Sequence, residues 1–188
     1  QLDAGRRHLQ ALRAAGQADR IQLLLAESQL LRDAGQTREA YSLLAESLAA
    51  QPEQPELLYE AALLAEKIGQ HDVLEANLRK LIALKPDHAH AYNALGYSFA
   101  ERNQRLAEAE QLITKALQLS PDDPFIIDSM GWVLSRKGDS AGAVLHLQRA
   151  YSIRPDPEIA AHLGEVLWLL GRQDEARRTW QEAAKANP

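Results

Sequence analysis

The sequence predicts an all-α fold: an α-solenoid of about five helical hairpins, with a partial repeat at the N-terminus. Of the 188 residues, 32 are Ala and 31 are Leu, both strong helix formers, whereas Val, Ile and Thr together number only 15. Helix breakers also recur at a nearly constant period, and a period of about 20–50 residues is typical of stacked repeats. These two observations exclude an all-β or an α/β fold.

Proline and glycine mark the boundaries of the repeats. One set of breakers is Pro52, Pro86, Pro121, Pro155 and Pro188, and a second set between them is Gly35, Gly69, Asn103, Gly138 and Gly171. The prolines are separated by 34, 35, 34 and 33 residues. Each interval carries apolar residues at helical spacing, such as Leu58, Ala61 and Ala65. The repeating element is therefore a helix, a short turn, a second helix and another turn.

The elements follow in order from the N-terminus. Residues 1–18 read as the second helix of a truncated repeat, because Ala4, His8 and Ala11 have helical spacing and Gly16 follows them. The solenoid then occupies 19–188, with repeats at approximately 21–54, 55–88, 89–123, 124–156 and 157–188. The repeat that contains Asn103 is one residue longer, so we expect its internal turn to be distorted.

The residues at the helix ends agree with these boundaries. Asp123-Pro124 and Asp156-Pro157 each place an Asp at a helix N-cap and a Pro at the first helical position, where its missing N–H costs nothing. The four glycines of the second set suit a left-handed residue just after a helix end.

The third and later repeats resemble the tetratricopeptide repeat, whose pattern is W-x-x-L-G-x-x-Y, A-x-x-x-F, then A and P. The matching residues are Tyr92, Leu95, Gly96, Phe99, Ala109, Ile113, Ala116 and Pro121; then Ile127, Met130, Gly131, Leu134, Ala143, Leu147, Ala150 and Pro155; then Ala160, Leu163, Gly164, Leu167, Ala176, Trp180, Ala183 and Pro188. The two earlier repeats are more degenerate. The resemblance covers essentially the whole chain and implies a right-handed solenoid that binds other proteins.

The resemblance also indicates which residues line the concave groove. Tyr92, Leu95 and Phe99 form the buried stripe of their helix, and the groove stripe is rotated from it by about 100°. Shifting that stripe by the period predicts the binding residues Tyr59, Leu63, His90, Asn93, Tyr97, Phe125, Asp128, Trp132, Arg136, Glu165 and Trp168.

Four of these side chains are large aromatics, Tyr59, Tyr97, Trp132 and Trp168, which we expect to face one groove. Tyr and Trp are enriched at the energetic centres of interfaces. Asn93 could hold the backbone amides of an extended peptide, as Asp128 could. The alternative is that these rings pack against the neighbouring helix and only shape the superhelix.

Other functions lack the residues they need. The net charge of −5 gives no positive field for nucleic acid, there is no Cys, and no apolar run is long enough to span a membrane. Two histidines in a His-x-His sequence on a helix, as at His88 and His90, point about 200° apart, so no metal site is expected. We predict no catalytic residue and no cofactor. His146 and His162 are expected to be packed or surface histidines.

One subclass of the family binds the C-terminal carboxylate of chaperones through Lys, Asn and Arg on first helices. The corresponding residues here are Leu25, Gln29, Tyr59, Leu63, Asn93 and Tyr97. Because the basic clamp is absent, that subclass is excluded.

A sharper resemblance covers Ala91 to Pro188. The segments 92–97, 128–134 and 157–168 are similar to the C-terminal repeats of proteobacterial outer-membrane tetratricopeptide lipoproteins. In one pseudomonad member, the lipoprotein is the adaptor of a periplasmic C-terminal processing protease and helps present peptidoglycan hydrolases for degradation. The resemblance implies a periplasmic chain, associated with the outer membrane through a longer, lipid-anchored parent protein.

Two alternatives remain open at this point. The chain could instead be a structural segment whose ends stack into a longer solenoid or a homo-oligomer, with recognition carried elsewhere in the parent protein. Without the lipoprotein resemblance, a cytoplasmic location fits the sequence equally well, because the absence of Cys suits both compartments.

Overall fold

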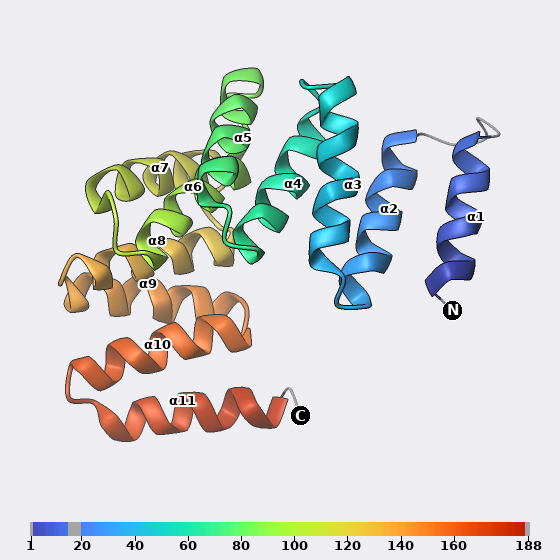
Figure 1. Cartoon of the computed structure of the whole chain (residues 1–188). Helices are drawn as coiled ribbons and strands as arrows, with labels where there is room; N and C mark the ends of the chain where they lie inside the picture. Colours follow the sequence, from blue (N-terminus) through green and yellow to red (C-terminus); the bar gives the residue numbers. More distant parts are fainter. Residues whose placement is uncertain (1, 15–19, 187–188) are drawn as a thin grey trace. The chain divides into compact units, whose positions relative to one another are not determined.

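The computed structural model describes residues 2–14 and 20–186, and these residues form helices joined by short turns with no strand among them (Figure 1). Gly16, expected to end the first helix, lies outside the described residues. The chain divides into two compact units, Gln1–Pro86 and Asp87–Pro188, called unit 1 and unit 2 below. The all-α solenoid prediction is confirmed.

Unit 1 contains α1 (Leu2–Ala14), α2 (Arg20–Asp33), α3 (Thr37–Ala50), α4 (Pro55–Lys67) and α5 (His71–Leu84). Unit 2 contains α6 (Ala89–Glu101), α7 (Leu106–Leu119), α8 (Pro124–Arg136), α9 (Ser140–Ile153), α10 (Pro157–Leu169) and α11 (Gln173–Ala186). Consecutive helices pair as hairpins, α2 with α3, α4 with α5, α6 with α7, α8 with α9 and α10 with α11, and α1 packs on α2. No helix of the described chain is both long and apolar enough to cross a bilayer.

The turns follow the residues that the sequence singled out. The four glycines of the second set of breakers have φ between 75° and 90°, as expected for left-handed residues that end helices. In the longer repeat the turn is built differently, because Asn103 and Arg105 adopt positive φ values of 52° and 47° without being glycine. The expected distortion at this turn is confirmed.

The proposed Asp caps are also present. The carboxylate of Asp123 accepts hydrogen bonds from the backbone N–H groups of Phe125 and Ile126, at 2.9 and 3.3 Å. The Asp156 carboxylate accepts one from the N–H of Glu158 at 3.0 Å. In both helices Pro occupies the first turn, as the sequence predicts.

Glycine lets the two helices of a hairpin approach closely. A Cβ on Gly96 would lie 2.7 Å from Ile113 Cγ1, and one on Gly131 would lie 2.5 Å from Leu147 Cγ. These distances are well below van der Waals contact, so side chains at either position must displace the facing helix.

The first helices of the hairpins lie on the inner side of unit 2. Helix α8 contacts both α6 and α10, whereas α7, α9 and α11 make no comparable backbone approach to one another within the described residues. Neighbouring first helices are therefore closer together than neighbouring second helices. Unit 2 consequently curves with α6, α8 and α10 on its concave side.

Candidate functional site

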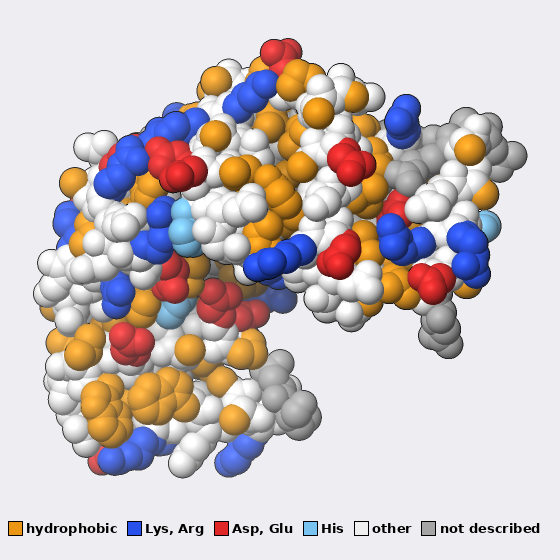
Figure 2. All heavy atoms as spheres, in the orientation of Figure 1, with side chains coloured by type: hydrophobic (Ala, Val, Ile, Leu, Met, Phe, Trp, Pro, Cys, Tyr) orange, Lys and Arg blue, Asp and Glu red, His pale blue; other side chains and the backbone are white. Residues whose placement is uncertain are grey.

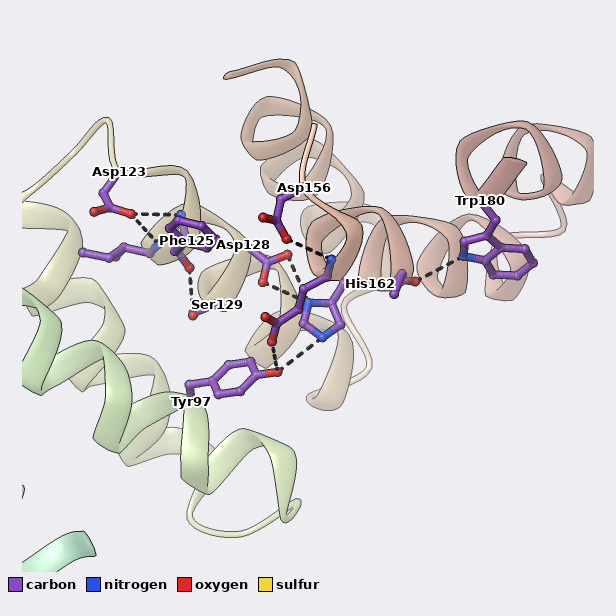
Figure 3. A network of polar contacts seen from close by, with 11 residues as sticks. Tyr97, Asp123, Phe125, Asp128, Ser129, Asp156, His162 and Trp180 are labelled. Carbon is purple, nitrogen blue, oxygen red and sulfur yellow. Dashed lines mark hydrogen bonds and ion pairs between the residues drawn. The ribbon is translucent and has the colours of Figure 1, made fainter. Parts of the chain in front are cut away.

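A polar network joins the three first helices of unit 2 on their concave side (Figure 3). Asp128 on α8 and His162 on α10 form a buried pair, with His162 Nδ1 at 2.9 Å from Asp128 Oδ2. Tyr97 on α6 donates its hydroxyl hydrogen to Glu158 Oε1 at 3.0 Å, and its oxygen lies 3.5 Å from His162 Nε2. Side chains of α6 and α10 thus meet although their backbones do not pack together.

The local sequence explains why these residues meet. Tyr97 lies at the repeat position that Trp132 occupies on α8, and Asp128 lies one helical turn before Trp132. His162 follows Glu158 by one turn on α10, so both side chains project toward the same neighbouring helices. Helical spacing therefore accounts for the pairing of Asp128 with Trp132 on one side of α8 and of Glu158 with His162 on one side of α10.

Aromatic stacking covers the network from one side. The Trp132 ring lies on the His162 ring, with centroids 4.2 Å apart and planes 21° from parallel. The Arg136 guanidinium lies 5.3 Å from the Trp132 centroid. Trp132 is consequently only 6% exposed. This ring packs against the neighbouring helix, which is the arrangement that the architectural alternative describes.

The charges of the pair are set by burial and by proximity. Burial raises the pKa of Asp128, although the hydrogen bond and the charge of His162 act in the opposite direction. Burial lowers the pKa of His162, but the hydrogen bond and the negative charge of Asp128 outweigh it, so the pKa is raised above 6.5. When His162 is protonated, Nδ1–H donates to Asp128 and Nε2–H points to the Tyr97 oxygen.

Tyr97 remains a hydrogen-bond donor over the whole physiological range. Burial raises the pKa of its hydroxyl, and the negative charges of Glu158 and Glu101 raise it further. The proton therefore stays on the phenol and is shared with the Glu158 carboxylate. A phenol fixed in this way can position a ligand, but it cannot act as a base near neutral pH.

Three buried polar atoms on this face find no hydrogen-bond partner among the described residues: Asn93 Oδ1, Trp132 Nε1 and Arg136 Nε. One is an acceptor and two are donors, and they belong to α6 and α8. An unpaired buried polar group costs about 1–3 kcal/mol. A polypeptide offers both N–H and C=O groups, which is the complementary chemistry for these side chains.

The other predicted residues of unit 2 lie nearer the solvent. His90 is exposed and lies beside the N-cap of α8, with Nε2 at 3.6 Å from Asp123 Oδ2. Phe125 is 38% exposed, and Arg154 lies over its ring at 5.1 Å from the centroid. Glu165 and Trp168 are exposed on α10.

The structure places two predicted residues, Tyr59 and Leu63, in unit 1. Both lie on α4 and are half-buried. They belong to a separate compact unit, so the single groove expected for all four aromatics stays a prediction, while Tyr97 and Trp132 share the concave side of unit 2.

Two residues of the network were absent from the predicted binding set, His162 and Glu158. Glu158 lies on the expected stripe of α10, whereas His162 corresponds to Ala94 and Ser129 in the two preceding repeats, one position outside the stripe. The sequence nevertheless contained a signal. His162 replaces the small residue found at this position in the two preceding repeats, and Asp128 lies on the groove stripe of the repeat before it.

Trp168 occupies a different position from the one expected. The period places Leu169, not Trp168, at the position of Arg136. In the structure Trp168 stacks on Trp180 of α11, with ring centroids 5.9 Å apart, and Arg177 lies over its ring at 5.2 Å. Trp168 therefore packs against α11 within the last hairpin and is not aligned with Trp132.

No cluster of three or more His, Cys, Asp or Glu side chains suited to a metal ion occurs in the part of the chain that the structure describes. The His162 ring stacks on Trp132, its Nδ1 pairs with Asp128 and its Nε2 lies 3.5 Å from the Tyr97 oxygen, so the ring nitrogens are already engaged by protein groups. This arrangement suits a structural and recognition role.

The helical hairpins, their concave first-helix face and the Gly-mediated contacts define a repeat protein of the α-solenoid class. The family model for the tetratricopeptide repeat matches residues 75–124 and 129–188, and the chain belongs to this family. The tetratricopeptide fold is typically a non-catalytic scaffold for protein–protein interaction.

Two curated proteins match part of this chain in sequence. The chain is 47% identical over 145 residues to a tetratricopeptide-repeat-containing protein of Pseudomonas aeruginosa, covering 77% of this chain and 25% of that protein. It is 36% identical over 104 residues to the protein O-mannosyl-transferase Tmtc1 of Drosophila melanogaster, covering 52% of this chain and 12% of that protein. The chain thus spans a quarter or less of these relatives.

Among solved structures, a tetratricopeptide repeat protein of Thermus thermophilus superposes with a TM-score of 0.80 at 25% identity. The superposition covers 89% of this chain and 91% of that one. The likeness supports the helical-repeat fold over the part of the chain that superposes.

Proposed function

We propose that the concave face of unit 2 binds an extended peptide or a partner protein. The observation that carries the proposal is the set of unpaired polar atoms on Asn93, Trp132 and Arg136, next to the fixed phenol of Tyr97. An extended segment laid across α6 and α8 can satisfy these atoms through its backbone, so recognition depends little on its sequence.

The Tyr97 network supports the same proposal by holding the binding face in one shape. The hydroxyl of Tyr97 reaches α10 from α6, and the Asp128–His162 pair ties α8 to α10. A face that is ordered before binding loses less conformational entropy when a peptide binds.

The proposal extends to a role for the parent protein. We infer that the chain contributes to an adaptor that brings peptidoglycan hydrolases to a periplasmic C-terminal processing protease, anchored at the outer membrane through the rest of the protein. The support is the resemblance of segments 92–97, 128–134 and 157–168 to such lipoproteins, together with the 47% identity to the P. aeruginosa relative.

Site-specific photo-crosslinking tests the binding face. A photoreactive phenylalanine derivative at His90 or Asn93, on α6, is irradiated in cell-envelope extract beside the same group at Gln111 or Gln148. The two glutamines are exposed on the second helices α7 and α9 and serve as matched controls. We expect one defined partner to be crosslinked from α6 only. Crosslinks to that partner from Gln111 or Gln148 alone would place binding on the convex side and overturn the proposal.

Reconstitution tests the adaptor role separately. Purified protease and hydrolase are incubated with and without this chain, and the rate of hydrolase degradation is followed on gels. We expect the chain to accelerate degradation and the Asn93→Ala variant to accelerate it less. Crosslinking from α6 to some other partner, with no acceleration here, would retain the binding face and reject the adaptor role.

The self-assembly alternative predicts a different result. Sedimentation equilibrium over a wide concentration range measures the mass of the chain, which is 20.9 kDa as a monomer. A concentration-dependent increase in mass that is abolished by substitutions on α11, with no crosslinked partner from α6, would favour a structural segment over a binding module.

A further inference from the structure

The end of unit 2 formed by α10 and α11 carries an unusual exposed apolar patch. Trp168 is 40% exposed, Leu169 63% and Trp180 37%. With Leu170, these residues make up half of the eight exposed large hydrophobic side chains in the described chain. Figure 2 shows hydrophobic side chains gathered over this end of unit 2. Contiguous exposed apolar surface of this kind commonly marks a binding site.

The patch surrounds a hollow of about 540 Å³, lined by Ala161, Glu165, Trp168, Leu169 and Trp180. The Trp168 and Trp180 rings stack with their planes 28° apart. The Trp180 indole N–H donates to the Ala161 carbonyl at 3.5 Å, which ties α11 to α10 beside the hollow (Figure 3). Glu165 is the one charged side chain in its lining.

Two indole rings beside one carboxylate are a suitable environment for an organic cation. A guanidinium or ammonium group is attracted to the face of an indole and pairs with a carboxylate, while its aliphatic stem packs on apolar neighbours. The structure already shows one such contact, because Arg177 lies 5.2 Å from the Trp168 centroid. The charge of Arg177 is engaged by Asp174, with Nη1 at 3.2 Å from Oδ1.

We propose that this hollow binds an arginine or lysine side chain of an extended peptide that lies along the concave face of unit 2. The inference rests on the proposed function, since the peptide is the one that α6 and α8 would hold. The inference adds that the bound peptide should carry a basic residue, flanked by an apolar residue, where it meets α10 and α11.

Charge complementarity favours a basic peptide as the occupant. The exposed carboxylates of the first helices in unit 2 are Glu101, Glu158 and Glu165, whereas Arg136 is half-buried over Trp132. A segment crossing these helices therefore meets excess negative charge, and a cation at the hollow reduces it.

A second copy stacked end to end fits this surface less well. On α9, Val144, Leu147 and Tyr151 pack against the next hairpin. At the positions of Val144 and Leu147, helix α11 has Arg177 and Trp180, and both are exposed. A further hairpin in the same geometry would bury the Arg177 guanidinium together with its Asp174 partner, which is costly.

The test uses the three tryptophan indole N–H signals in ¹H–¹⁵N NMR spectra of the whole chain, assigned by single substitutions. The probe is the peptide acetyl-Gly-Leu-Arg-Leu-Gly-amide, and its control has citrulline in place of arginine, which keeps the shape and removes the charge. We expect the arginine peptide to shift the signals of Trp168 and Trp180 more strongly than that of Trp132. The citrulline peptide is expected to shift them several-fold less at the same concentration.

Variants then separate the contributions. Glu165→Gln should weaken binding of the arginine peptide about threefold, the size of an exposed ion pair, while Glu182→Gln, an equal charge change elsewhere on the surface, should leave it unaltered. Trp168→Phe should weaken it about twofold to fivefold through the poorer cation–π contact. Arg177→Ala removes a like charge and uncovers the Trp168 ring, so it should strengthen binding.

Equal binding of the two peptides would overturn the inference, because the hollow would then be only apolar. Weaker binding by Arg177→Ala would also overturn it, since Arg177 would then be contacting an anionic group. Indole signals that never move, while α6 still crosslinks its partner from Asn93, would reject the cation site and leave the proposed function intact.

Discussion

The Asp128–His162 pair offers the sharpest test of how unit 2 holds its concave face. The side chains are 2.9 Å apart, and the two residues are only 4% and 8% exposed. Asp128→Asn keeps the volume and one acceptor oxygen but removes the charge. A hydrogen bond to a charged group contributes about 1.5–3 kcal/mol, so we expect this change to lower the free energy of unfolding of unit 2 by that amount at pH 6.

A double-mutant cycle isolates the pair from other effects. Asp128→Asn, His162→Gln and the double variant are compared by urea unfolding followed by circular dichroism. Because solenoid repeats do not always unfold in one step, amide hydrogen exchange in α6, α8 and α10 localises the loss. We expect a coupling free energy of about 1–3 kcal/mol. Asp122→Asn, which breaks the exposed 2.7 Å ion pair with Arg149, is the control and should cost about 0.5 kcal/mol or less.

Two results would refute this reasoning. If Asp128→Asn costs no more than Asp122→Asn, burial does not make the inner pair stronger than a surface pair. If the two single substitutions are additive in the double variant, the residues do not stabilise each other, and the geometry of the pair has no energetic consequence.

Three further predictions follow from the same structure. The free energy of unfolding should fall as the pH rises above 6.5, because the raised pKa of His162 means that its stabilising proton is lost in that range; the decline should be smaller in His162→Gln, measured by urea midpoints across the range. Gly131→Ala should destabilise by about 1–3 kcal/mol, because its Cβ meets Leu147 Cγ at 2.5 Å, and thermal unfolding measures it. Asp123→Ala should cost about 1 kcal/mol through the lost N-cap, checked by the same melts; an unchanged melting temperature would contradict the cap assignment.

Much of the fold is readable from the sequence because its determinants are local. The positive φ of Gly138 and the capping bonds of Asp123 depend on a few adjacent residues, and both follow from known end preferences of helices. The role of Gly96 is harder to predict from local sequence, because this glycine leaves space for Ile113 of the paired helix. A repeated motif makes that role predictable, because glycine recurs at the same position in all three hairpins of unit 2, as Gly96, Gly131 and Gly164.

The site was only partly predictable because it depends on distances between hairpins. Helical spacing places Asp128 and Trp132 on one stripe of α8, and the structure agrees. The same spacing does not say that a phenol on α6 reaches α10, two hairpins further along. That contact depends on the rotation between successive repeats, which no local pattern specifies. The misplacement of Trp168 has a simpler cause, since the groove stripe of α10 continues to Leu169, which follows Arg136 by 33 residues.

One repeat position explains how the three first helices of unit 2 came to differ. Ala94, Ser129 and His162 are equivalent, and only the last is large. Its ring stacks on Trp132 and forms a hydrogen bond with the carboxylate of Asp128, so most of the Trp132 ring is buried while its Nε1 stays unpaired. Tyr97, at the equivalent position on α6, stays half-buried and extends its hydroxyl toward α10. A single large residue thus divides two matching aromatics into a structural ring and a ring that borders the binding face.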